Sequence, residues 1–94
     1  MSADTVQGGD TTSISPVADR FTYLLPNPAT DHATVYSSFP IQNVAVFDPA
    51  GRCVLRRRVN DRTCHLDLTD YPKGIYLVTL TTPAGRTTKR LVVQ

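Results

Sequence analysis

Proline and glycine turn signals divide this sequence into short segments, and their spacing is the feature that most limits how the chain can fold. From Phe21 onward, runs rich in Val, Ile, Leu, Thr and Tyr are interrupted about every 8–12 residues, which is the pattern of an all-β domain. The runs are too short for helices, and no window shows sustained helical periodicity. The interruptions are Pro26-Asn27-Pro28, Asp48-Pro49-Ala50-Gly51, Asn60-Asp61, Tyr71-Pro72-Lys73-Gly74 and Pro83-Ala84-Gly85.

The segments between these turns predict seven short β-strands. Seven strands in a domain of this size are typical of an immunoglobulin-like antiparallel β-sandwich. The chain has no tryptophan, so it lacks the cysteine–tryptophan–cysteine core of antibody domains. The expected strands are Phe21–Leu25, His32–Ser37, Ile41–Phe47, Arg52–Val59, Thr63–Leu68, Gly74–Thr81 and Arg86–Val93.

The alternation of side chains along each strand predicts the core. The segment Gly74–Thr81 is apolar on both faces, which indicates a central strand. The predicted core residues are Leu25, Val35, Val44, Val46, Val54, Leu66, Leu68, Tyr76, Val78, Leu91 and Val93.

The first 20 residues differ from the rest in composition. They are rich in Ser, Thr, Asp and Gly and hold few large apolar side chains, which predicts a flexible linker before a domain at 21–94. They lack the basic start and apolar stretch of a signal peptide, so we expect an excised piece of a longer protein. No apolar run approaches the roughly 20 residues that span a bilayer. The net charge of +2, with acidic and basic residues interleaved, does not predict nucleic-acid binding.

Two adjacent pairs of reactive residues could belong to a catalytic or metal site. Asp31-His32 could form half of a catalytic relay, and Cys64-His65 could provide a thiol nucleophile or metal ligands. No G-x-S-x-G motif and no second pair at zinc spacing accompany them. Adjacent strand residues also point to opposite faces, so structural roles are favoured. For Cys53 and Cys64, two separate small buried or half-buried side chains are favoured over a disulfide.

Two charged groups could bind ions or anionic ligands. Arg56-Arg57-Arg58 could bind phosphate or an anionic polysaccharide, but the favoured interpretation is a solvated hairpin edge that resists edge-to-edge aggregation. Asp48, Asp67 and Asp70 could form a calcium site, but they lack the ligand spacing of a known calcium loop. Hydrogen bonding within turns explains Asp48 and Asp70. The sequence therefore predicts a non-enzymatic domain with no metal and no cofactor.

The segment Lys89–Gln94 reads as a β-strand that continues to the end of the printed sequence. Its residues Lys89, Arg90, Leu91, Val92, Val93 and Gln94 combine a basic start with apolar alternation. We expect the end of this strand to be readable by a partner, and its backbone could add to a partner's sheet.

Four short elements spread over residues 23–94 form a recognisable pattern. They are Pro26–Asp31 (PNPATD), Val44–Arg52 (VAVFDPAGR), Leu66–Thr69 followed by Gly74–Val78 (LDLT and GIYLV), and Lys89–Val93 (KRLVV). Together they resemble the type A C-terminal sorting domain of the type IX secretion system. The residues that carry the resemblance inside the domain are Pro26, Asn27, Pro28, Asp31, Asp48, Gly51, Gly74 and Tyr76. Gln94 departs from it, because many members end on lysine or arginine.

The resemblance implies a function. Such domains direct cargo proteins of the Bacteroidetes group from the periplasm through the outer-membrane translocon, helped by shuttle proteins, to the outer membrane, the cell surface or the medium. A sortase-like cysteine peptidase usually removes the domain, which places the expected cleavage in residues 2–20. The resemblance also implies an immunoglobulin-like sandwich. We expect the translocon to recognise chiefly Lys89–Gln94.

Other functions remain open from the sequence. The domain could be a non-catalytic β-sandwich that binds carbohydrate or the cell surface, or an uncleaved docking module of the secretion apparatus. Against sugar binding, the chain has no tryptophan and its tyrosines, Tyr23, Tyr36, Tyr71 and Tyr76, are scattered along the sequence.

Overall fold

The computed structural model describes residues 16–94. Most of the predicted linker and cleavage region, residues 1–15, lies outside the described residues. The elements in chain order are α2 (Pro16–Arg20), β2 (Thr22–Leu25), β3 (His32–Phe47), β4 (Cys53–Asp67), β5 (Gly74–Thr82) and β6 (Gly85–Val93). The paired strands are antiparallel throughout, which confirms the prediction of an antiparallel β fold.

Residues 16–94 contain five strands rather than the predicted seven, because two pairs of predicted strands are each one long strand. His32–Ser37 and Ile41–Phe47 merge into β3, and Arg52–Val59 and Thr63–Leu68 merge into β4. The predicted turn at Asn60-Asp61 is wrong, since both residues lie inside β4. The backbone adjusts to the bend instead, with a positive φ of 56° at Asn60 and shifts of register on both sides of Ile41.

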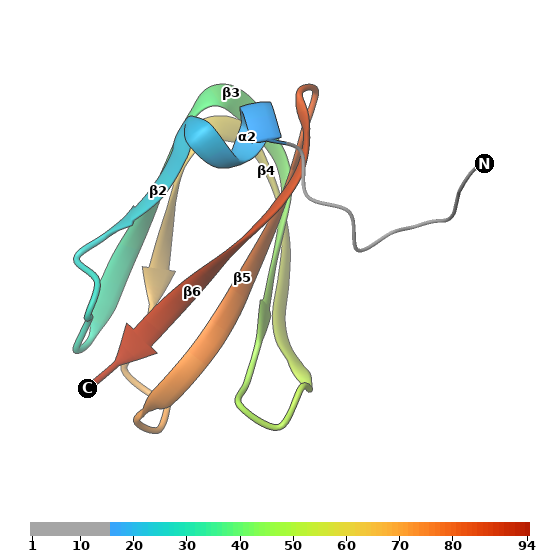
Figure 1. The fold of residues 1–94 in the computed structure, drawn as a ribbon. Coiled ribbons are helices and arrows are strands. Elements are labelled where there is room, and N and C mark those ends of the chain that lie inside the picture. The colour runs from blue at the N-terminus through green and yellow to red at the C-terminus, as the bar shows by residue number, and fades with distance from the viewer. Residues whose placement is uncertain (1–15) are drawn as a thin grey trace.

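The five strands form a single curled sheet rather than a confirmed sandwich. The strand order is β2-β3-β5-β6, with β4 paired to β3. The first half of β3 pairs with β2 and the second half with β5, while β4 accompanies β3 along almost its whole length. The long strands thereby bend from one side of the core to the other, and the sheet closes around it (Figure 1). An isolated parallel bridge between Ala29 and Val93 joins the two ends of this curl.

The core lies inside the curl and agrees with most of the predicted positions. Val35, Val44, Val46, Leu66, Leu68, Tyr76, Val78, Leu91 and Val93 are all buried. Two predictions are wrong. Leu25 is 53% exposed because the side chains of β2 alternate, with Thr22 and Leu24 pointing into the core and Leu25 pointing outward. Val54 is 42% exposed because the register shifts between Val46 and Phe47, and Leu55 packs against the core instead.

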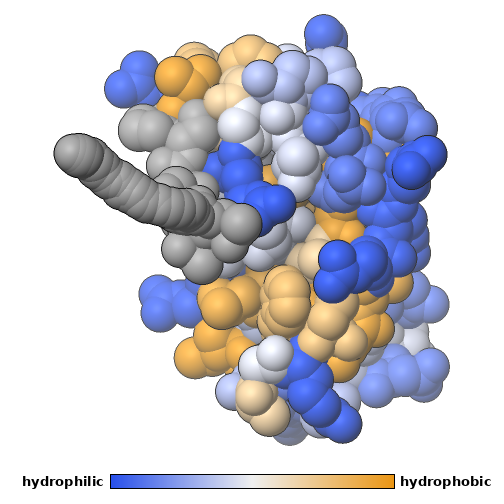
Figure 2. Space-filling model, turned by 90° about the vertical axis from the view of Figure 1, so that its right-hand side faces the viewer, coloured by the Kyte–Doolittle hydropathy of each residue, from blue (hydrophilic) through white to orange (hydrophobic). Residues whose placement is uncertain are grey.

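The short helix α2 closes one end of the curl (Figure 1). It packs against β6, its Ala18 is fully buried, and the Ala18 carbonyl accepts a 2.7 Å hydrogen bond from the Thr22 hydroxyl. No helix within residues 16–94 has the length and apolar character needed to cross a membrane. Apolar side chains also remain at the surface, and they gather in the lower half of the side shown in Figure 2.

Candidate functional site

The end of β6 is held on both of its edges. One edge pairs with β5, where Gly74 lies opposite Val93 and Tyr76 opposite Leu91. On the other edge the Asn27 side chain takes the place of a strand: its Nδ2 donates to the Arg90 carbonyl at 2.8 Å, and its Oδ1 accepts from the Val92 amide at 3.0 Å. An asparagine amide offers one donor group and one acceptor, as a backbone peptide does.

The chain continues this second edge at Ala29. The Ala29 amide donates to the Val92 carbonyl at 2.7 Å, and the Gln94 amide donates to the Ala29 carbonyl at 2.8 Å. The outward backbone groups from Arg90 to Gln94 are therefore already hydrogen-bonded. The expectation that this part of the strand offers a free edge for a partner's sheet is wrong, because the segment 27–29 occupies that edge.

Side chains of the six predicted recognition residues alternate between the core and the surface. Leu91 and Val93 are buried, at 0% and 3% exposure, while Arg90 and Gln94 are exposed. Lys89 and Val92 are half-buried. Lys89 and Arg90 thus point to opposite faces of the sheet, as neighbours in a strand do. Of these six side chains, only those of Arg90 and Gln94 are exposed, because Leu91 and Val93 point into the core.

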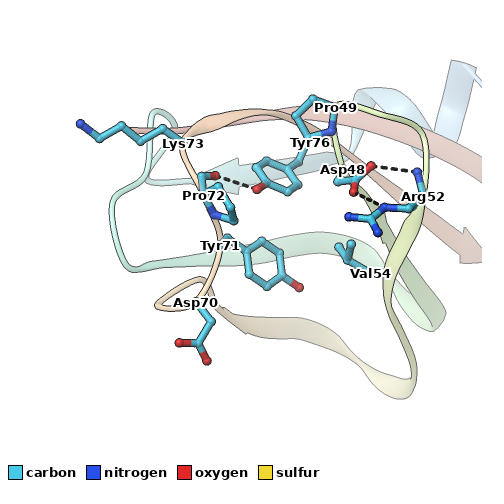
Figure 3. A pocket seen from close by; sticks show the side chains of 9 residues that line it. All are labelled: Asp48, Pro49, Arg52, Val54, Asp70, Tyr71, Pro72, Lys73 and Tyr76. Atoms are coloured by element: carbon cyan, nitrogen blue, oxygen red, sulfur yellow. Dashed lines mark hydrogen bonds and ion pairs between the residues drawn. The ribbon is translucent and has the colours of Figure 1, made fainter.

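Asp48 organises the tight turn between β3 and β4. Its Oδ1 accepts from the Ala50 amide at 3.0 Å and the Arg52 amide at 2.8 Å, and its Oδ2 accepts from Arg52 Nε at 3.0 Å (Figure 3). The Arg52 amide is the main reason why the pKa of this carboxyl is lowered, and the Arg52 guanidinium adds to it. Gly51 has a φ of +91°, which L side chains rarely adopt. These contacts explain both motif residues by the geometry of the turn.

Gly74 allows this turn to pack against the start of β5. A Cβ atom at position 74 would lie 2.9 Å from the Pro49 Cγ, which is closer than carbon atoms approach in proteins. Two residues later, the Tyr76 hydroxyl donates to the Pro72 carbonyl at 2.6 Å. The Tyr76 ring, 2% exposed, packs at 5.3 Å from the ring of Tyr71. The motif glycine and tyrosine therefore join the β3–β4 turn to the turn before β5.

A pocket of about 260 Å³ lies between these two turns (Figure 3). Burial raises the pKa of Tyr71, whose ring forms part of the wall. Among residues 16–94 no group of three His, Cys, Asp or Glu side chains is arranged to hold a metal ion. The residues that line the pocket are Asp48, Pro49, Arg52, Val54, Asp70, Tyr71, Pro72, Lys73 and Tyr76.

The remaining motif residue, Asp31, connects the turn before β3 to the end of β4. Its carbonyl accepts from the Leu68 amide at 2.9 Å, and its Oδ1 lies 2.8 Å from His32 Nδ1. This hydrogen bond from His32 lowers the pKa of Asp31. The loop of residues 26–31, the two turns around the pocket and the end of β6 thus meet at one end of the fold (Figure 1).

Residues 23–94 match the family described as the secretion system C-terminal sorting domain, which belongs to the type IX system. The chain belongs to this family. Domains of this family are, in general, non-catalytic sorting signals. A search of curated proteins finds no match.

The fold of the sorting domain is also found in a solved structure of PorZ from Porphyromonas gingivalis. Its title describes PorZ as an essential bacterial surface component of the type-IX secretion system. The TM-score is 0.69 at 20% sequence identity, over 85% of this chain and 12% of PorZ. The sorting domain therefore spans only a small part of the length of that protein, and the likeness is one of fold.

The catalytic candidates of the sorting domain do not assemble into a relay. Asp31 lies in the bend before β3 and His32 is an exposed strand residue, which agrees with the favoured structural role. The two side chains nevertheless touch, because the bend places them on the same side. Both side chains are largely exposed, at 72% and 68%, as a surface pair would be. His65 Nδ1 lies 2.9 Å from the Thr34 hydroxyl, and the buried Cys64 Sγ accepts from Arg57 at 3.7 Å.

The other charged and sulfur-containing candidates also separate in space. Cys53 and Cys64 are both free, in agreement with the favoured interpretation, and Cys64 is buried as expected. Cys53 is exposed, so the prediction that it is buried or half-buried is wrong. Asp67 accepts hydrogen bonds from the Thr69 hydroxyl at 2.6 Å and amide at 3.0 Å, which lowers its pKa. This is a role within its own turn rather than in a calcium site with Asp48. The hydrogen-bonding role predicted for Asp70 is wrong, since no hydrogen bond of its side chain is described among residues 16–94; it lines the pocket instead.

The tyrosines of the sorting domain are not scattered, contrary to the argument made against sugar binding. Tyr23 and Tyr36 stack across β2 and β3 with centroids 5.3 Å apart. Tyr71 and Tyr76 pair at the pocket. The sequence missed these pairs because Tyr23 and Tyr36 meet only through the register of β2 on β3.

Sequence reasoning also missed the partner of Asn27. The available signal was the pair of prolines around it. Neither Pro26 nor Pro28 has an amide proton, so this segment cannot pair as an ordinary strand, and the asparagine amide is left to supply donor and acceptor.

Proposed function

We propose that residues 21–94 act as the address that directs their parent protein across the outer membrane through the type IX translocon. The observation that carries the proposal is that three family-motif residues are direct neighbours of the end of β6. Asn27 hydrogen-bonds to its backbone, and Gly74 and Tyr76 pair with Val93 and Leu91. The motifs thereby fix the position of the last strand, whose exposed residues Arg90 and Gln94 are offered to the translocon and its shuttle proteins.

The proposed route of the parent protein passes through the periplasm. From there the translocon carries it to the outer membrane, the cell surface or the medium. Because the domain is folded by packing of residues far apart in sequence, it reaches the translocon as a formed surface rather than as a linear peptide.

We further propose that a sortase-like cysteine peptidase removes the domain at the cell surface. The peptidase needs an extended chain in its groove. Residues 16–20 form α2, with Ala18 buried against the sheet, so cleavage is expected in residues 2–15 rather than across the whole predicted region 2–20. Mass spectrometry of the exported parent protein tests this: a new C-terminus within residues 2–15 supports it, and an intact domain on the surface protein contradicts it.

Retention of the domain is the second candidate. The fold likeness to part of PorZ, described as a surface component of the type-IX secretion system, favours a domain that stays on its parent and docks it to the apparatus. The same mass measurement separates the two, because a docking module remains attached to the surface-located parent.

The terminal address is tested with a secreted reporter fused to this chain in a type IX-competent bacterium. Deleting Leu91–Gln94 would trap the fusion in the periplasm, but this deletion also removes the buried Leu91 and Val93. A double variant of exposed residues, Arg90→Ala with Gln94→Ala, avoids that problem. Its matched control is Arg62→Ala with Gln42→Ala, which changes the same residue types at other exposed positions.

We expect export of the Arg90/Gln94 variant to fall at least about tenfold, because truncating an arginine at a protein interface can remove much of the binding energy. The control variant should be exported normally. Melting curves of both variants confirm that the fold is intact. Normal export of the folded Arg90/Gln94 variant would show that the end of β6 is not the address.

A further inference from the structure

The outer face of the sheet formed by the paired parts of β4, β3, β5 and β6 has an unusual distribution of charge. Residues directly opposite each other in neighbouring strands share one face of a sheet. The strand register therefore assigns four rows to this face. The rows are Arg58-Asn43-Thr81-Arg86, Arg56-Ala45-Thr79-Thr88, Cys53-Phe47-Leu77-Arg90 and Ile75-Val92, and we call the surface they form the basic face.

None of the positions of the basic face holds an acidic residue. The two ion pairs described in residues 16–94 are His32–Asp31 and Arg52–Asp48, and neither includes Arg56, Arg58 or Arg90. Arg56, Arg58 and Arg90 are all exposed. The positive charge of this face is therefore not balanced by carboxylates within it.

The basic face also carries exposed apolar side chains. Ile75 and Leu77 are 50% and 46% exposed at the centre of the sheet, and the neighbouring Phe47 and Val92 are half-buried. Arginine and aromatic residues are enriched in protein–protein interfaces, while lysine, aspartate and glutamate are depleted. The basic face has this composition: its four charged residues are all arginines.

The dimensions of the face indicate an extended partner. Arg58 and Arg86 end the same row, three strand spacings apart, and neighbouring strands lie about 4.8 Å apart, which places their Cα atoms roughly 14 Å from each other. One small anion cannot reach both sides of such a row. Arginine binds carboxylates in a bidentate geometry, so several separate carboxylates fit the face better.

We propose that the basic face is a docking surface for an acidic protein, whose carboxylates meet Arg56, Arg58 and Arg90 and whose apolar residues cover Ile75 and Leu77. This inference rests on the proposed function, because it names the chemistry of a partner that a sorting domain meets at the outer membrane. It differs from the proposed recognition of Arg90 and Gln94 at the end of β6, because Arg56 and Arg58 of β4 and Ile75 and Leu77 of β5 also contact the partner.

The test measures binding of the fluorescently labelled full chain to outer-membrane fragments from a type IX-competent bacterium. The decisive variant is Arg56→Glu with Arg58→Glu. Its matched control, Arg20→Glu with Arg62→Glu, makes the same change of net charge at exposed positions outside the face. Circular dichroism verifies that each variant is folded.

We expect saturable binding that weakens at least about tenfold in the Arg56/Arg58 variant, because like charges then face each other across the contact. The control variant should bind within about twofold of the unaltered chain, since distant surface charges are largely screened at 0.15 M salt. Protease treatment of the membranes should abolish the binding.

Three results would overturn the proposal. They are absence of binding, equal weakening by both double variants, and binding to protein-free vesicles of phosphatidylglycerol that depends on Arg56 and Arg58, which would assign the face to lipid. The export assay tests the proposed function separately. If the chain binds membranes through the basic face but the fused reporter is not exported, the sorting role is refuted and the docking surface is not.

Discussion

The Asn27 side chain accepts a hydrogen bond from the backbone amide of Val92, 65 residues later in the chain, at 3.0 Å. The same side chain donates to the carbonyl of Arg90. A residue of the first turn thus completes the edge of the last strand, and this relationship gives the family motif around Pro26 a structural reason.

Replacing Asn27 by alanine is expected to destabilise the domain by about 0.5–1.5 kcal/mol, the usual net value of a hydrogen-bond loss at an accessible site. Urea unfolding measures the change. Asn43→Ala, at an exposed position of β3, should change stability by less than about 0.5 kcal/mol. Asn27→Asp keeps the acceptor for Val92 but sets a carboxylate oxygen against the Arg90 carbonyl, so it should also be less stable than the unaltered domain. Equal stability of all three variants would contradict the role of Asn27.

Replacing Gly74 by alanine is expected to destabilise the domain by about 1–3 kcal/mol, because its Cβ would overlap Pro49. Removing the Pro49 ring should relieve this clash. In a double-mutant cycle, Pro49→Ala should therefore reduce the cost of Gly74→Ala. Gly51→Ala is the control: its cost comes from the positive φ, so Pro49→Ala should leave it unchanged. Additive effects of Gly74→Ala and Pro49→Ala would show that the contact is unimportant.

Asp48 is expected to make stability depend on pH in the acid range. Its pKa is lowered from 3.8 in the folded domain, chiefly by the Arg52 amide. A group whose folded pKa is lowered stabilises the fold above its unfolded pKa, and this contribution is lost as the pH falls through the folded pKa. Unfolding measured from pH 5 to pH 2 should thus be less pH-dependent in Asp48→Asn. Asp70→Asn makes the same substitution at an exposed position and serves as the matched control.

The two thiols are expected to differ in reactivity. Cys53 is exposed and Cys64 is 4% exposed, so a maleimide reagent should modify one thiol in the folded domain and two after unfolding. Cys53→Ser should abolish the fast reaction, and Cys64→Ser should leave it. Mass spectrometry counts the modifications. Two unreactive thiols in the folded domain would indicate a disulfide and contradict the structure.

The sequence predicted what depends on local periodicity. The apolar residues on both faces of Gly74–Thr81 predicted a central strand, and β5 does lie between β3 and β6. The predicted strand boundaries were wrong where the residues typical of a turn lie at a bend inside a continuous strand. Asn60-Asp61 is a favourable turn pair, yet pairing of β4 with β3 along the whole hairpin outweighs that local preference. Pro40 is likewise tolerated inside β3, in the stretch between Tyr36 and Ile41 where the register shifts.

The candidate site was predictable in composition but not in arrangement. The motif residues could be named from the sequence, including Asn27, Gly74 and Tyr76. Their contacts could not, because each depends on a partner far along the chain, such as Val92 for Asn27. The same holds for the basic face. Arg56 and Arg58 are more than 30 positions from Arg90 in the sequence, and only the pairing of the strands brings all three onto one surface.

The bond between Asn27 and the end of β6 also sets an order of folding. Hairpins such as β3–β4 join residues that are close in sequence and can form early, whereas contacts between the first turn and the last strand must close the longest loop. During synthesis this closure waits until residues 90–94 have left the ribosome. A chain that is cut short before these residues lacks the partners of Asn27 and cannot complete the domain.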